Sequence, residues 1–114
     1  MQKKNYMEAA TIFDKVRTLY PESPLKEKAY FQFGSCYFNT GEVDKALAIF
    51  KDIYGRLPDS DIGRLSKYQM GWCYFKMNRE GDAIRELEDF LVKYPDSEIT
   101  ADVEYGLGEY YYNR

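Results

Sequence analysis

The sequence of 114 residues predicts an all-α fold, in which about six helices form antiparallel hairpins that stack into an α-solenoid. Three observations predict this class: a repeat of 37 residues, helical spacing of apolar residues within each repeat, and short breaks between helical segments. Six sets of residues recur at the 37-residue step: Gly34, Gly71 and Gly108; Pro21, Pro58 and Pro95; Ala9, Ala46 and Ala83; Phe13, Phe50 and Leu87; Tyr37, Tyr74 and Tyr111; Ser23, Ser60 and Ser97. Because all six sets share one spacing, the chain is an array of repeats without insertions between them.

The apolar positions within a repeat follow the period of an α-helix. Tyr30, Phe33, Cys36 and Tyr37 recur at intervals of three and four residues, and no stretch alternates for long with the period of a strand. The predicted helices are 4–20, 24–39, 42–57, 61–77, 80–94 and 98–113.

The breaks between these segments contain residues that end or start helices. The segment 39–41, Asn-Thr-Gly, ends one helix and starts the next. Ser23 precedes Pro24, the pattern of an N-cap followed by proline at the first helical position, and Ser60 and Ser97 occupy equivalent places. The linkers are only a few residues long, so consecutive helices are expected to be antiparallel.

The whole chain is one array and one domain by this interpretation. Both ends are incomplete repeats, so we expect a fragment of a longer array or ends that pack on something else. The predicted units are 1–22 (the second helix of a truncated repeat), 23–59 and 60–96 (complete repeats), and 97–114 (the first helix of a truncated repeat).

Each repeated glycine lies inside a predicted helix, where glycine costs ~1 kcal/mol relative to alanine. Close approach of the partner helix would offset this cost. We therefore expect Ala46 to face Gly34 and Ala83 to face Gly71, with the large apolar residue four positions after each alanine in the layer below. Each repeated proline follows a helix and prevents its extension.

Charge and composition exclude several classes of function. The chain has 16 basic and 19 acidic residues, a net charge of −3, no histidine and two cysteines. These values argue against nucleic-acid binding, the common catalytic triads and the usual zinc sites, and no apolar run approaches the ~20 residues of a membrane span. Residues 1–57 carry +2 and residues 58–114 carry −5, so the second half either favours a cationic partner or is a solvated helix surface.

Two sets of polar side chains are interpreted as structural. Cys36 and Cys73 are equivalent by the repeat, and a buried thiol is favoured there over a redox role, at a separation too large for a disulfide. The carboxylates of Glu86, Glu88 and Asp89, on a helix expected to face outward, are interpreted as solvated charge.

The repeated residues resemble the tetratricopeptide repeat signature of an aromatic residue, Leu-Gly, Tyr, Ala, Phe and Pro. In the first complete copy these residues are Tyr30, Phe33, Gly34, Tyr37, Gly41, Ala46, Phe50 and Pro58. The second copy departs at Lys67, where the family has an aromatic residue, and mildly at Leu87. The resemblance covers essentially the whole chain and implies a superhelix whose first helices line a concave groove.

The period of 37 exceeds the usual 34 residues, and the additional residues follow the proline in a Tyr-Pro-acid-Ser form, as in 20–23 and 94–97. This form is similar to repeats of bacterial cell-envelope proteins, namely the Tol-Pal accessory protein and the lipoprotein of the outer-membrane barrel assembly complex. The likeness favours a periplasmic or cell-envelope location over the cytoplasm.

Carried over position by position, the resemblance places a binding groove on the first helices. Its residues are Lys28, Phe31, Ser35, Phe38, Asn39, Leu65, Tyr68, Trp72, Phe75, Lys76, Asp102, Tyr105, Glu109, Tyr112 and Asn113. Seven of these fifteen residues are aromatic, which is typical of a binding surface, although the same rings could instead pack against one another between neighbouring first helices.

Some family members hold a peptide carboxylate in this groove with Lys, Asn and Arg. Only Lys28, Asn39 and Lys76 are candidates here, so we expect an apolar or proline-containing partner segment, with basic residues facing Asp102 and Glu109. The leading hypothesis is a non-catalytic protein–protein interaction scaffold that needs no metal or cofactor. The alternative is an architectural spacer that self-associates through the open ends of the solenoid.

Overall fold

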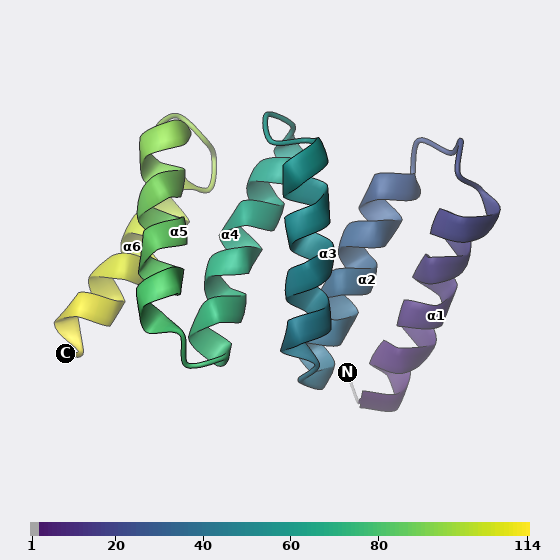
Figure 1. The fold of residues 1–114 in the computed structure, drawn as a ribbon, viewed down its shortest axis with the longest axis horizontal. Coiled ribbons are helices and arrows are strands. Elements are labelled where there is room, and N and C mark those ends of the chain that lie inside the picture. The colour runs from purple at the N-terminus through teal and green to yellow at the C-terminus, as the bar shows by residue number, and fades with distance from the viewer. Residues whose placement is uncertain (1–2) are drawn as a thin grey trace.

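Six α-helices arranged side by side make up residues 3–114, the part of the chain that the computed structural model describes (Figure 1). The helices are α1 (Lys3–Leu19), α2 (Lys26–Thr40), α3 (Val43–Arg56), α4 (Asp61–Lys76), α5 (Glu80–Lys93) and α6 (Thr100–Tyr112), and the described residues contain no strand. They form a row in chain order, with α1 at one end and α6 at the other, and the molecule measures 44 × 30 × 19 Å. The predicted all-α solenoid of helical hairpins is confirmed. The proposed unit boundaries stay a prediction, and residues 1 and 2 of the first unit lie outside the described residues.

The links from α2 to α3 and from α4 to α5 turn in the same way. Gly41 and its repeat equivalent Asn78 have positive φ angles, of 91° and 60°. Glycine and asparagine are the residues that most readily adopt this left-handed conformation at the end of a helix. In each link the following amide, of Glu42 or Arg79, donates to a carbonyl of the preceding helix at 2.9 Å. The predicted break at 39–41 is confirmed, with the helix ending one residue later than expected.

The serine N-cap is correct for one of the three repeat positions. Ser60 Oγ accepts from Gly63 N at 2.9 Å and caps α4. Ser23 and Ser97 do not cap helices, because α2 and α6 begin later and these hydroxyls accept from amides only two residues ahead, those of Leu25 and Ile99. The prediction was wrong for these two serines.

Gly63 explains the difference. A Cβ atom on Gly63 would lie 1.7 Å from the carbonyl oxygen of Leu57, so the loop before α4 folds onto the space where other residues carry a side chain. The equivalent positions are Lys26 and Thr100, whose side chains exclude this approach. The chain before α2 and α6 therefore forms an additional turn, and the helix begins only at Lys26 and Thr100 themselves.

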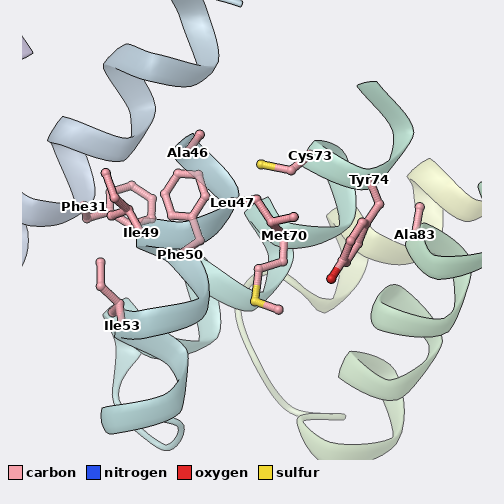
Figure 2. Packing of buried hydrophobic residues seen from close by; sticks show 10 residues of the cluster. All are labelled: Phe31, Ala46, Leu47, Ile49, Phe50, Ile53, Met70, Cys73, Tyr74 and Ala83. Atoms are coloured by element: carbon pink, nitrogen blue, oxygen red, sulfur yellow. The ribbon is translucent and has the colours of Figure 1, made fainter. Parts of the chain in front are cut away.

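The core lies between neighbouring helices and contains the repeated apolar residues. Ala46, Phe50, Ala83 and Leu87 are fully buried, and Figure 2 shows Phe50 beside Ile49 in the first cluster. The nearest side chains to two of the glycines are these large ones, because a Cβ on Gly34 would lie 3.0 Å from Phe50 and one on Gly71 would lie 2.6 Å from Leu87. The residues that we placed one layer below therefore fill the gaps at Gly34 and Gly71, and the expected facing of these glycines by Ala46 and Ala83 stays a prediction.

Cys36 and Cys73 are both free and buried. Burial raises the pKa of Cys36 and raises that of Cys73 to about 12. Because the thiolate is the reactive form, both side chains are held as unreactive thiols at neutral pH.

Lys67 replaces the usual aromatic residue and is almost completely buried, with a side chain 2% exposed. Its ammonium group lies 2.8 Å from a carboxylate oxygen of Glu86 and 2.8 Å from one of Asp89, and 4.8 Å from the centre of the Tyr54 ring. The interpretation of these carboxylates as solvated charge was wrong for Glu86 and Asp89, which neutralise a lysine between α4 and α5. Glu88 is exposed, as expected, and accepts from the Tyr111 hydroxyl at 3.0 Å.

Two equivalent glycines should respond in opposite directions to alanine. Gly71→Ala places a methyl group 2.6 Å from buried Leu87, and we expect a loss of about 1–2 kcal/mol in the free energy of unfolding. A Cβ atom added at Gly108 would meet no other side chain or helix within 4 Å, so Gly108→Ala should gain up to about 1 kcal/mol from helix propensity alone. Urea unfolding of both variants followed by circular dichroism tests this, and equal shifts of one sign would contradict it.

Candidate functional site

Two aromatic hollows lie side by side along α4. The first, the α4–α6 hollow, has a volume of about 430 Å³ and is lined by Tyr68, Trp72, Phe75, Asp102, Tyr105, Gly106, Glu109, Tyr110 and Asn113. The second, the α2–α4 hollow, has a volume of about 490 Å³ and is lined by Phe38, Tyr68, Gln69, Trp72, Phe75 and Lys76. Three residues of α4 belong to both linings, so we refer to the two hollows together as the aromatic groove.

The shared wall comes from the helical period of α4. Tyr68, Trp72 and Phe75 are spaced by four and three residues, which places them on one face of the helix. The equivalents of Trp72 in the neighbouring units are Ser35 and Glu109, so a large ring stands where the other helices have a hydroxyl or a carboxylate. The indole therefore separates a hollow on its α2 side from one on its α6 side.

The rings along this wall contact one another in sequence. Tyr68 and Trp72 meet edge to face with centroids 6.0 Å apart, and Trp72 and Phe75 are 5.4 Å apart. Phe75 then meets Tyr110 of α6 at 5.5 Å. The expected alternative, in which the groove rings pack between neighbouring first helices, thus applies to Phe75, which meets a ring of α6 that was not among the predicted residues. These contacts fix the orientation of the rings.

Gly106 makes room for the indole. A Cβ atom on Gly106 would lie 3.0 Å from both Cζ2 and Cη2 of Trp72, closer than nearly all side-chain contacts. The equivalent residues in the other repeats are Gln32 and Gln69. A glycine at this one position therefore allows Trp72 to lie against the backbone of α6 and form the floor of the α4–α6 hollow.

The two hollows differ in charge. Asp102 and Glu109 belong to the lining of the α4–α6 hollow, which contains no basic residue, and Tyr105 carries a raised pKa because its hydroxyl is hydrogen-bonded to Glu109. The α2–α4 hollow instead contains Lys76, whose ammonium group lies 6.0 Å from the centre of the Phe38 ring. The aromatic groove is thus acidic on its α6 side and basic on its α2 side.

The structure brings together most of the residues predicted for the groove. Those in the two hollows are Phe38, Tyr68, Trp72, Phe75, Lys76, Asp102, Tyr105, Glu109 and Asn113. Ser35 is half-buried and Asn39 exposed, and neither lines a hollow described here. Three more lie in other hollows: Lys28 in one between α1 and α2, Leu65 in a polar one beside Asp61 and Asp96, and Tyr112 in one along α6 that it shares with Tyr105, Gly108 and Glu109.

Phe31 requires a correction. It was expected in the exposed aromatic row with Tyr68 and Tyr105, but only 8% of it is exposed and its ring lies 5.2 Å from that of Phe50 (Figure 2). Its helix α2 is covered by α1 on one side and α3 on the other, so the ring completes the core and is inaccessible to a partner.

Tyr110, Gly106 and Gln69 line the groove but were not among the predicted residues. The repeat contained a signal for the first two. Tyr110 occupies the position of Cys36 and Cys73, where a ring is too large for the small buried site. It turns instead toward Phe75, and its hydroxyl donates to Glu80 at 2.9 Å. Residues that differ from their equivalents in the other repeats therefore indicated the groove, in addition to the residues that keep the repeat spacing.

Among residues 3–114, no cluster of three or more acidic or cysteine side chains is arranged to hold a metal ion. None of the helices described in the structure combines the length and apolarity needed to cross a membrane.

Comparison with known proteins finds one family that matches this chain. Residues 2–90 match the family model described as anaphase-promoting complex, cyclosome, subunit 3, which is built of tetratricopeptide-like repeats. A search of curated proteins found no match. The narrower likeness to bacterial envelope proteins stays a prediction. The match covers well over half of the chain, and the chain therefore belongs to this family of tetratricopeptide-type repeats, whose members generally mediate protein–protein interactions rather than catalysis.

Proposed function

We propose that the aromatic groove binds an extended segment of a partner protein, with an apolar or proline residue in contact with Trp72 and a basic residue in the α4–α6 hollow. The observation that carries this proposal is the position of Trp72, which forms a wall of both hollows while remaining partly exposed. Aromatic side chains held by their neighbours offer a large contact area at a small cost in conformational entropy.

Several features support a basic residue at the α6 side. The lining of the α4–α6 hollow supplies two carboxylates, Asp102 and Glu109, and four aromatic rings besides Trp72. A lysine or arginine side chain can place its aliphatic stem and its charge against ring faces while the charged end reaches a carboxylate. Lys76 lies in the neighbouring α2–α4 hollow and favours an acidic or carbonyl group in the part of the partner segment that occupies that hollow.

Intrinsic fluorescence of Trp72, the single tryptophan of the chain, gives a direct readout. The probes are two ten-residue synthetic peptides of proline and leucine that differ only in one central residue, arginine or glutamate. We expect the arginine peptide to change the emission of Trp72 in a saturable manner and to bind at least about tenfold more tightly than the glutamate peptide, with an advantage that falls as salt is added.

A matched pair of variants separates the groove from the rest of the surface. Tyr105 is 71% exposed and lines the α4–α6 hollow, whereas Tyr20 is 61% exposed and lies outside both hollows. Tyr105→Ala should weaken binding of the arginine peptide by about tenfold, a loss typical of an interface aromatic, and Tyr20→Ala should leave it unchanged. Equal binding of both peptides, or equal effects of both substitutions, would refute this function.

A further inference from the structure

The lining of the α4–α6 hollow has the composition of a cation site. Among the described residues it contains five aromatic rings, two carboxylates and no basic side chain. The face of an aromatic ring is the negative end of its quadrupole, so rings and carboxylates attract the same kind of ligand. The volume of about 430 Å³ is in the range of ligand pockets. The geometry of the rings then decides which cation fits best.

Tyr68 and Trp72 form a right-angled corner in this hollow. Their ring planes meet at 89° and their centroids lie 6.0 Å apart. A compact cation in the angle between two perpendicular rings contacts the face of each, and tryptophan attracts a cation more strongly than the other aromatic residues do. Both residues belong to α4, a middle helix of the row (Figure 1). The corner is therefore an internal feature of the array.

Neighbouring groups hold the corner in position before any ligand binds. The ring of Phe75 lies 5.4 Å from that of Trp72. On the α6 side, an added Cβ at Gly106 would lie only 3.0 Å from the indole, so the backbone of α6 limits the movement of Trp72. Rings that are already fixed lose little conformational entropy on binding, which favours a rigid and compact ligand group.

The carboxylates of α6 flank the position opposite this corner. Asp102, Tyr105 and Glu109 are spaced by three and four residues, so they share one face of the helix, with a carboxylate about one turn before the tyrosine and another about one turn after it. All three belong to the lining of the hollow. A cation between α4 and α6 therefore has ring faces on one side and negative charge on the other.

The α4 wall discriminates between kinds of cation through hydrogen bonding. An unmodified ammonium group carries three N–H donors, and a guanidinium carries five, each of which needs an acceptor once water is displaced. The only acceptor on this wall is the hydroxyl of Tyr68, because the indole of Trp72 can only donate and Phe75 has no polar side-chain atom. A trimethylammonium group has no N–H, so it retains its charge and leaves no donor unsatisfied.

The α2–α4 hollow has the same α4 wall but lacks these features. Its lining contains no carboxylate, and Lys76 already places an ammonium group 6.0 Å from the centre of the Phe38 ring. This charge would repel a second cation. A quaternary ammonium group is thus directed to the α6 side of Trp72.

We propose that the α4–α6 hollow binds the trimethylammonium group of a trimethylated lysine in the partner segment. This inference rests on the function proposed for the aromatic groove, since it names the basic residue that the hollow receives. The methyl groups contact Tyr68 and Trp72, and the charge is attracted by the carboxylates of α6. Recognition of quaternary ammonium groups by sets of aromatic rings is a known use of the cation–π interaction.

Three ten-residue peptides of proline and leucine separate the effect of charge from that of the methyl groups. Their central residue is trimethyllysine, lysine, or the neutral tert-butyl analogue in which carbon replaces the nitrogen of trimethyllysine, and Trp72 fluorescence reports binding. We expect the trimethyllysine peptide to bind at least about tenfold more tightly than either of the others. A lysine peptide or a neutral peptide that binds as tightly as the trimethyllysine peptide overturns the proposal.

The arginine and glutamate peptides keep this result distinct from the proposed function. If the arginine peptide binds more tightly than the glutamate peptide while methylation of lysine brings no gain, the groove function stands and the trimethyllysine assignment is wrong. If no peptide changes the emission of Trp72 in a saturable manner, both are wrong.

Two substitutions of Tyr68 test the corner itself. Tyr68→Leu removes one ring face but keeps an apolar side chain, so the preference for trimethyllysine over lysine should fall from about tenfold to about twofold. Tyr68→Phe keeps the ring and should retain the preference, which also shows that substitution at this position leaves the groove folded. An unchanged preference in Tyr68→Leu contradicts the corner as the binding site.

A matched pair of charge variants tests the carboxylates. Asp102 and Glu104 are both exposed on α6, but only Asp102 lines the hollow. Asp102→Asn should weaken binding of the trimethyllysine peptide by about threefold at low salt, and Glu104→Gln should leave it unchanged. Equal effects of the two substitutions would show that only the net charge of α6 matters and would overturn the assigned position of the cation.

Choline carries the same trimethylammonium group without a peptide and tests its source. Because a peptide also contacts the rest of the groove, choline should displace the trimethyllysine peptide only at concentrations at least about a hundredfold above the dissociation constant of that peptide. Choline binding as tight as that of the peptide would assign the hollow to a free small molecule and overturn the assignment to a partner segment.

Discussion

Gly63→Ala is expected to lower the free energy of unfolding by about 2–3 kcal/mol, the largest effect among the glycine-to-alanine changes in this chain. The added Cβ would lie 1.7 Å from the Leu57 carbonyl oxygen and 2.7 Å from its carbon, and a backbone carbonyl cannot turn aside as a flexible side chain can. The loop before α4 must therefore open. Opening it also removes the hydrogen bond from Gly63 N to Ser60 Oγ, a helix cap worth about 1 kcal/mol.

Gly63→Ala should also change the conformation of the loop before α4 in a specific way. With a side chain at residue 63, the loop should adopt the conformation seen before α2 and α6, in which the helix begins two residues later. Hydrogen exchange should then show lost protection in the first turn of α4 and unchanged protection in α5. Gly55→Ala, at a helical glycine with open space around it, is the control and should be neutral or stabilising by up to about 1 kcal/mol. Stability of Gly63→Ala equal to that of the control would contradict the close approach.

Lys67→Met is expected to cost about 2 kcal/mol although it replaces a charge in the core by an apolar side chain of similar length. Removing one partner of a buried ion pair leaves the other charges uncompensated, and this loss is as large as 3–5 kcal/mol when the pair is fully buried. Glu86 and Asp89 are 23% and 40% exposed, so they recover part of their hydration and the loss is smaller. Chemical denaturation at neutral pH measures the difference.

The pH dependence of this loss has a definite sign. Burial acts against the charge of Lys67, but hydrogen bonds to Asp89 and Glu86 outweigh it and raise its pKa, so its contribution is complete below its ordinary value of 10.5 and disappears as the pH rises through the folded value. The hydrogen bond from Lys67 lowers the pKa of Asp89, so that contribution is complete above 3.8 and disappears as the pH falls. The cost of Lys67→Met should therefore be greatest between about pH 5 and pH 9 and shrink in acid.

Lys67→Tyr provides a control with the same backbone and a related contact. Tyrosine is the equivalent residue in the preceding repeat, where Tyr30 faces Asp52. It retains a hydroxyl donor for Asp89, so it should destabilise the protein less than Lys67→Met does and with a weaker dependence on pH. A methionine variant as stable as the parent protein at pH 7 would show that the ion cluster contributes nothing net.

Several features of this protein follow from the order of residues alone. The 37-residue recurrence of glycine, proline and aromatic residues predicted the number of helices and their antiparallel stacking, and the helix limits were correct to within two residues. This succeeds because helix period, helix-ending residues and short links are local properties, so each segment contains most of the information about its own conformation. Placing Tyr68, Trp72 and Phe75 on one face required only the helical period.

The contacts across helices were decided by the tertiary structure. Phe31 and Tyr105 are equivalent by the repeat, yet Phe31 is buried and Tyr105 exposed. The reason is that α2 has neighbouring helices on both of its sides, whereas α6 lies at the end of the row and has them on one side only. Lys67 was recognised as a departure, but its burial depends on carboxylates 19 and 22 positions later in the chain. Likewise, the groove floor exists because Gly106 lies opposite Trp72. A repeat sets which residues are equivalent, whereas the environment of each one depends on the side chains that the neighbouring helix presents, and those differ from copy to copy.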